Sequence, residues 1–91
     1  MSENTPNDVA WELDARGLNC PEPLMLVRNK VRTMEIGERL RVVATDPTTT
    51  RDLQNFCRFL KHEMEFSDIR QSDSNAGVEE FVYVIRKGTG A

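Results

Sequence analysis

The spacing of apolar residues in the first half of the chain predicts a strand, a helix and a second strand. In residues 9–16 every second side chain is apolar, which is the pattern of a half-buried strand. From residue 21 to about residue 34 apolar side chains recur at intervals of three and four, as in an amphipathic helix, and Gly37 marks the turn that follows. Residues 40–45 are short, β-branched and apolar on both faces, which favours a strand inside a sheet.

A second helix is expected after Asp46-Pro47, because proline cannot continue a strand ladder. Thr48 or Thr49 is its expected cap, and the helix should run to about His62. Its apolar residues lie at i, i+3, i+4 and i+7 and form one stripe, made of Leu53, Phe56, Cys57 and Leu60.

The last third of the chain predicts a hairpin. Residues 64–71 form a weaker strand, residues 72–77 the loop, and residues 81–85 the strongest strand by residue type. The expected order is therefore βαβαββ, an α+β fold. Two amphipathic helices and a four-stranded sheet each need a partner for their apolar side, so we expect both helices on one face of the sheet.

Composition fits one small domain, since the 91 residues are 38% hydrophobic and 30% charged. We expect a flexible polar tail over residues 1–8, a single domain over residues 9–88 and a C-terminal tail over residues 89–91. The net charge of −3 argues against direct nucleic-acid binding. No apolar run is long enough to span a membrane and the first eight residues lack the order of a secretory signal, so a cytoplasmic location without membrane contact is expected.

The stretch GLNCPEPL, residues 17–24, places a cysteine where the first helix begins. With Cys20 as N-cap, Pro21, Glu22 and Pro23 occupy the first three helical positions, where proline removes no ladder bond and stiffens the turn. A helix N-terminus lowers the pKa of a cysteine. Two missing N–H donors and the charge of Glu22 weaken that effect, so we expect a modest lowering of the thiol pKa.

The two cysteines differ in their surroundings. Cys57 lies in the apolar stripe of the second helix, which favours packing over chemistry. For Cys20, position alone leaves a reactive and a packing role equally open. The cysteines are 37 positions apart and the chain has one histidine, which falls short of a zinc ligand set, so neither a metal nor a cofactor is expected. His62, near the end of the second helix, is expected to be structural.

Several motifs together resemble the TusA family of small sulfur carriers. They are LDARGLNCPEP at residues 13–23, with the family's Cys-Pro-x-Pro signature, followed by Asp46-Pro47, Arg51-Asp52 and a closing Arg-Lys-Gly at residues 86–88. The resemblance implies a two-layer α/β sandwich with a mixed sheet, like the C-terminal domain of translation initiation factor three. It also implies that Cys20 accepts sulfane sulfur as a persulfide from a cysteine desulfurase and passes it to a relay protein. Such a carrier takes part in sulfurtransferase-type transfer rather than turning over as an enzyme.

The final sulfur acceptor is left open by the residues. In the best-known branch of the family the sulfur reaches 2-thiouridine in tRNA, while sulfur oxidation and molybdenum-cofactor supply are alternatives. A thiol redox sensor is a rival class, but Cys57 is poorly placed to resolve an oxidised Cys20. A ubiquitin-like thiocarboxylate carrier needs a terminal Gly-Gly, whereas this sequence ends Gly-Thr-Gly-Ala.

Helical geometry suggests where a partner docks. At about 100° per residue, Met25, Arg28 and Arg32 share one flank of the first helix, with Glu22 nearer the thiol. Methionine adapts to different partners and arginine is enriched at interfaces, although a merely solvated face is the competing interpretation. Arg51 is expected near Cys20, where it either steadies an anionic persulfide or pairs with an acid such as Asp52.

Overall fold

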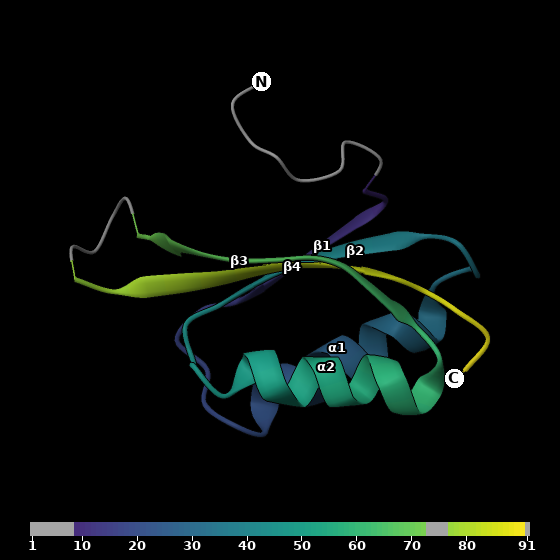
Figure 1. Ribbon diagram of the computed structural model, residues 1–91, viewed down its shortest axis with the longest axis horizontal. Coiled ribbons are helices and arrows are strands. Elements are labelled where there is room, and N and C mark those ends of the chain that lie inside the picture. The colour runs from purple at the N-terminus through teal and green to yellow at the C-terminus, as the bar shows by residue number, and fades with distance from the viewer. Residues whose placement is uncertain (1–8, 73–76, 91) are drawn as a thin grey trace.

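The computed structural model describes residues 9–72 and 77–90. The predicted tail over residues 1–8 and the centre of the predicted hairpin loop lie outside the described residues. The described elements follow the predicted order βαβαββ (Figure 1): β1 (Trp11–Ala15), α1 (Glu22–Thr33), β2 (Arg39–Ala44), α2 (Thr49–Leu60), β3 (Glu63–Gln71) and β4 (Glu79–Arg86). In this part of the chain no helix is long and apolar enough to cross a membrane.

The four strands form one mixed sheet in the order β1-β2-β4-β3. β1 and β2 run parallel, whereas β4 pairs antiparallel with both β2 and β3. Both helices lie beneath the same face of this sheet, so the molecule has two layers (Figure 1). The predicted sandwich of a four-stranded mixed sheet and two helices is confirmed.

The core lies between the sheet and the helices. Successive side chains of a strand point to opposite faces of the sheet, and those on one face pack against the apolar stripes of α1 and α2. The hydrophobic residues of this buried cluster are Val27, Val31, Met34, Leu40, Val42, Leu53, Phe56, Cys57, Phe81, Tyr83 and Ile85.

α2 ends two residues earlier than predicted. Lys61 has a left-handed backbone (φ 61°) and its N–H bonds to the carbonyl of Cys57, which stops the helix after Leu60. Residues 88–90 return against this end. A Cβ on Gly88 would lie 1.7 Å from the carbonyl oxygen of Lys61, so the two backbones touch closely.

The N-terminal ends of both helices point to the same end of the molecule (Figure 1). The β1–α1 and β2–α2 connections therefore meet there, because β1 and β2 run parallel. This arrangement brings the segment around Cys20 next to the segment that starts at Asp46.

Candidate functional site

Cys20 lies exposed in the connection from β1 to α1, directly before the N-cap of the helix. The N-cap is Pro21 and the first helical residue is Glu22, so the prediction that Cys20 itself is the N-cap is wrong by one residue. The reason is a tight turn in which the Glu22 N–H donates to the Asn19 carbonyl (2.9 Å). The helical ladder starts only with the bond from the Met25 N–H to the Pro21 carbonyl (3.1 Å).

The two prolines shape the start of α1 in different ways. The peptide bond between Cys20 and Pro21 is cis. Pro23 is the second helical residue and is buried, whereas Glu22 is exposed beside it. Pro23 removes no ladder bond, because a donor in the first turn has no partner within the helix.

Asp46 fixes the backbone of the Cys20 segment. Its Oδ2 accepts the Cys20 N–H (2.7 Å), and its Oδ1 accepts the N–H and the hydroxyl of Thr48 (2.9 and 2.8 Å). The N–H groups of Thr48 and Cys20 lower the pKa of Asp46 below its ordinary value of 3.8. Thr48 is the N-cap of α2, as predicted, but its side chain makes no capping bond within that helix.

The carboxylate of Asp52, in the first turn of α2, lies against the Cys20 thiol. The thiol donates to Oδ2 of Asp52, with Sγ and Oδ2 3.5 Å apart. The sequence considered Asp52 only as a possible partner of Arg51, and this contact was missed. The available signal was the parallel course of the strands before both helices, which brings the first turn of α2 close to the start of α1.

The surroundings of Cys20 raise the pKa of its thiol. The hydrogen bond to Asp52 is the largest cause, followed by partial desolvation and by the charges of Asp52 and Asp46, while a hydrogen bond with Thr48 acts in the opposite direction. The expected modest lowering of the thiol pKa is therefore wrong. A negatively charged acceptor favours the protonated thiol, and the prolines have removed donors that would favour the thiolate.

The first turn of α2 is tied to the sheet through Tyr83 in β4. The hydroxyl of this fully buried side chain bonds to the hydroxyls of Thr49 (2.7 Å) and Thr50 (2.8 Å). The Thr49 hydroxyl also bonds to the Asp46 carbonyl (2.7 Å). Because of these bonds, the sheet determines where Asp52 meets the thiol.

Cys57 and His62 are parts of the packed interior. Cys57 is buried, and burial raises the pKa of its thiol to about 11. His62 is buried, accepts the Gly88 N–H at Nδ1 (2.9 Å) and packs against the ring of Phe56. Among the residues that the structure describes, no group of three or more His, Cys, Asp and Glu side chains is placed to hold a metal ion.

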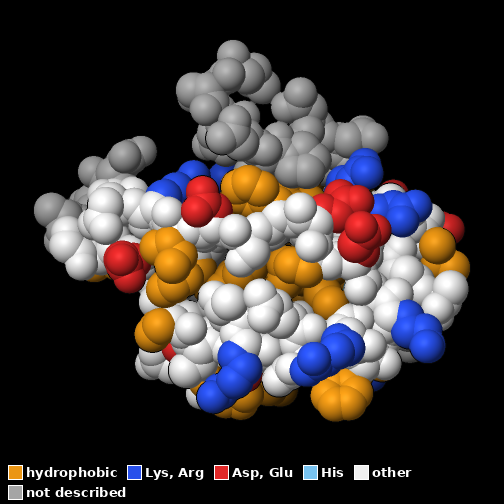
Figure 2. All heavy atoms as spheres, in the orientation of Figure 1, with side chains coloured by type: hydrophobic (Ala, Val, Ile, Leu, Met, Phe, Trp, Pro, Cys, Tyr) orange, Lys and Arg blue, Asp and Glu red, His pale blue; other side chains and the backbone are white. Residues whose placement is uncertain are grey.

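The flank of α1 that was proposed for docking is exposed along its length. Met25 is 55% exposed, and Arg28 and Arg32 are exposed as well. Figure 2 looks onto the α2 side of the helical layer, where Lys and Arg side chains also lie beside hydrophobic side chains at the surface. The structure thus presents a surface of mixed apolar and basic character next to the site.

A shallow groove of about 470 Å³ lies between the outer sides of the two helices. It brings Arg28 of the predicted flank together with Asp52, and it includes Phe59, which is 78% exposed and which sequence analysis placed in no site. Met25 and Arg32 lie outside its lining. The groove is lined by Leu24, Arg28, Asp52, Asn55, Phe56, Phe59 and Leu60.

Sequence analysis left two roles open for Arg51, contact with a persulfide or pairing with an acid, and the structure shows the pair with Asp52. Its Nε is 3.6 Å from Oδ1 of Asp52, and its side chain is 73% exposed. A pair this exposed contributes little to stability. The guanidinium thus lies at the outer side of the Asp52 carboxylate, and a contact with a persulfide stays a prediction.

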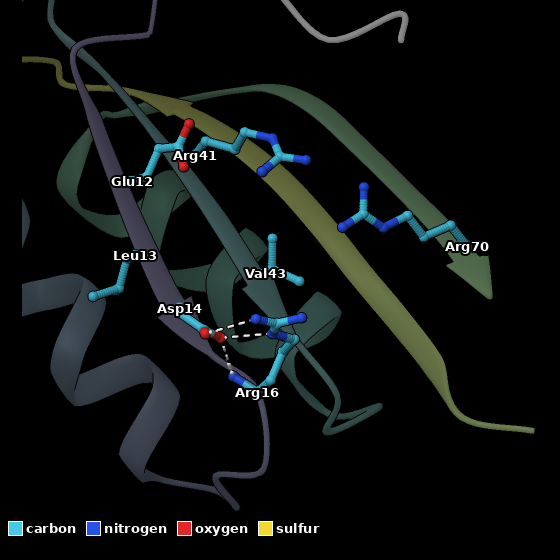
Figure 3. Close-up of a pocket in the computed structure, with 7 residues that line it drawn as sticks. All are labelled: Glu12, Leu13, Asp14, Arg16, Arg41, Val43 and Arg70. Carbon is cyan, nitrogen blue, oxygen red and sulfur yellow. Dashed lines mark hydrogen bonds and ion pairs between the residues drawn. The ribbon is translucent and has the colours of Figure 1, made fainter. Parts of the chain in front are cut away.

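A second hollow, of about 290 Å³, lies on the sheet face opposite the helices (Figure 3). Arg16 binds Asp14 there through two nitrogens, each 2.9 Å from a carboxylate oxygen, and also reaches Glu80 (3.4 Å). Glu80 accepts a further bond from Arg70 (3.0 Å). The guanidinium groups of Arg16 and Arg70 are thus compensated by carboxylates, and this hollow is a network of ion pairs.

Comparison with known proteins places these features in a family. The family model of the sulfurtransferase TusA matches residues 12–87. The chain belongs to the TusA family. Membership of the TusA family indicates a sulfur carrier. A crystal structure of a SirA-like protein from Desulfitobacterium hafniense, 23% identical in sequence, shows the same fold, with a TM-score of 0.58 over 81% of this chain and 95% of that one.

Proposed function

We propose that this protein carries sulfane sulfur as a persulfide on Cys20. The observation that carries the proposal is the exposed thiol in a hydrogen-bonded frame of Asp46 and Asp52, within the Cys-Pro-Glu-Pro sequence of residues 20–23. Cys57 is buried in the core and is not available for exchange with another protein. Persulfidation is a reversible modification of cysteine, as a carrier requires.

Loading and delivery are two thiol exchange steps of the same kind. In loading, Cys20 gives up its proton to solvent and its thiolate attacks the outer sulfur of the donor's cysteine persulfide. A bond forms between Cys20 and that sulfur, the sulfur–sulfur bond of the donor breaks, and the donor cysteine leaves as a thiolate. In delivery an acceptor thiolate attacks the outer sulfur, and Cys20 leaves as a thiolate. In each step the sulfane sulfur is transferred from one cysteine to another with no net oxidation or reduction.

The proposed donor is a cysteine desulfurase, and the proposed acceptor is a relay protein that leads to 2-thiouridine in tRNA. An acidic carrier, with a net charge of −3, suits contact with proteins and has no need to hold tRNA itself. We propose that the donor docks on Glu22, Met25, Arg28, Arg32 and Arg51. The groove beside Arg28 is lined in part by Asp52, which contacts the thiol, and this supports docking next to the site.

The proposal is tested by incubating the protein with a cysteine desulfurase and cysteine. Intact mass measurement should show the addition of one sulfur atom, which a reductant removes. Cys20→Ser should not load at all. Cys57→Ser is the matched control: it should load fully, with a loss of up to about 1.5 kcal/mol in the free energy of unfolding from disturbed packing.

Two results would contradict the carrier role. One is sulfur loading that persists in Cys20→Ser. The other is oxidation of Cys20 by peroxide under conditions in which the desulfurase loads nothing, which would favour a redox sensor.

A further inference from the structure

The contact between Asp52 and Cys20 makes the environment of the thiol unusual for a nucleophile. Reactive cysteines generally lie beside cations or free helix N–H donors. Here the thiol donates to a carboxylate whose side chain is only 19% exposed, and this contact outweighs a hydrogen bond with Thr48 that acts in the opposite direction. The carboxylate of Asp46 is also nearby, because it accepts the backbone N–H of Cys20. Nε of Arg51 lies 3.6 Å from Oδ1 of Asp52, whereas the thiol contacts Oδ2.

We propose that Asp52 holds the Cys20 sulfur in its neutral, protonated form in the free protein and thereby restrains its reaction with small electrophiles. The inference deepens the proposed function, on which it rests, by assigning a control of reactivity to the same site. The geometry carries it, because the thiol donates directly to a carboxylate oxygen, and deprotonation places two negative charges about one hydrogen-bond length apart. The raised pKa of Cys20, with Asp52 as its largest cause, agrees with this direction.

A purely structural role for Asp52 is the competing explanation. An acidic residue in the first turn of a helix is favourable for the helix dipole, whatever lies beside it. That role predicts an effect of Asp52 on folding and none on the titration of the thiol. Glu79 supplies a matched control, since it is an exposed acidic residue at the start of β4 and is not among the causes of the thiol's shift.

The effect of removing the carboxylate has a characteristic dependence on pH. Each unit by which the thiol pKa falls gives tenfold more thiolate at neutral pH but lowers the nucleophilicity of that thiolate by about 2.5- to 3-fold. Alkylation near pH 7 therefore accelerates by about 3- to 4-fold per unit. Above the thiol pKa values of both proteins the thiol is fully ionised in each, so the variant is alkylated more slowly than the wild type, by about 2.5- to 3-fold per unit of pKa difference.

The experiment measures alkylation by iodoacetamide between pH 6.5 and 10.5, followed by mass spectrometry of the peptide that contains Cys20. For Asp52→Asn the rate profile should move to lower pH and cross that of the wild type. Glu79→Gln should give the wild-type profile. Coinciding profiles of Asp52→Asn and wild type would overturn the proposal, and so would an equal shift in Glu79→Gln.

A measurement on the wild type keeps the test valid even if Asp52→Asn does not fold. Cys20 in the protein should titrate at higher pH than in the unstructured, end-blocked peptide GLNCPEPL, and titration at the same or lower pH would overturn the proposal. Loading by a desulfurase is scored separately. If loading fails while the thiol profile shifts as expected, the carrier role falls and the hold of Asp52 on the thiol stands. If loading succeeds and the thiol profile does not shift, the carrier role stands and the proposed hold of Asp52 on the thiol falls.

Discussion

Asp46 joins two segments that lie far apart in the sequence, because one carboxylate accepts N–H groups from Cys20 and Thr48. Its lowered pKa means that the folded protein binds the proton more weakly at this group than the unfolded chain does. The stability that Asp46 contributes is therefore fully present above its ordinary value of 3.8 and is lost as pH falls through the lower, folded value.

Asp46→Ala should accordingly be less stable than the wild type near pH 6, and the difference should shrink as the pH falls below 3.8. Urea unfolding midpoints of both proteins at pH 6, 4 and 2.5 measure this. A difference that stays constant down to pH 2.5 would show that the charged carboxylate is not the source of the stability.

At the level of single residues, the sequence identified Cys20 as the candidate thiol but not its chemical state. Position at a helix start and the absence of an apolar stripe around Cys20 are local features, which a sequence displays directly. The contact with Asp52 depends on two connections meeting across the sheet edge, over 32 positions of sequence. For that reason the direction of the pKa shift was predicted wrongly.

At the level of elements, α1 presents an apolar face to the core and an exposed flank that includes Met25, Arg28 and Arg32. Helical periodicity predicted this division, because it is set by the 3.6-residue repeat alone. Helix ends were predicted less well. α2 stops at Leu60 because Lys61 adopts a left-handed conformation, which periodicity does not indicate.

Arg32→Glu should weaken binding to a cysteine desulfurase by at least about tenfold, if the partner presents an acidic surface to this flank. The position is exposed, so the free energy of unfolding should change by no more than about 1 kcal/mol. Alkylation of Cys20 should proceed at the wild-type rate, since twelve helical residues span about 18 Å, well beyond the Debye length at physiological salt. Calorimetric titration measures the binding.

The matched control for that change is Arg86→Glu. It makes the same charge reversal at an exposed residue of β4 whose side chain points away from the helices, as the alternation beside the buried Ile85 requires. Binding of Arg86→Glu should equal that of the wild type. Equal losses in both variants would indicate a general effect of net charge, and no loss in either would leave the flank of α1 as a solvated face.

At the level of the whole molecule, the thiol lies at the N-terminal ends of the two helices, whereas Gly88 packs against Lys61 at the C-terminal end of α2. The element order and the covered sheet face were predictable, since amphipathic patterns require partners. The strand order was not, because the position of β4 between β2 and β3 depends on long-range pairing that no local pattern encodes.

Gly88→Ala should lower the free energy of unfolding by about 1–3 kcal/mol, because a Cβ there would lie 1.7 Å from the Lys61 carbonyl oxygen and the backbones would have to separate. The bond from Gly88 to His62 would be strained with it. Thr89→Ala, at the exposed neighbour, should change stability by no more than about 0.5 kcal/mol. Urea unfolding measures both, and equal stabilities of the two variants would contradict the close packing.

The frame around Cys20 also has a consequence for protein synthesis. The residues that contact its backbone and its sulfur follow it by 26 and 32 positions. A ribosome adds residues at about 5–20 per second, so Cys20 leaves the exit tunnel about 2–6 s before Asp52 does. During that interval the nascent chain exposes an ordinary cysteine, and the restrained thiol comes into being only when the second helix folds onto the first.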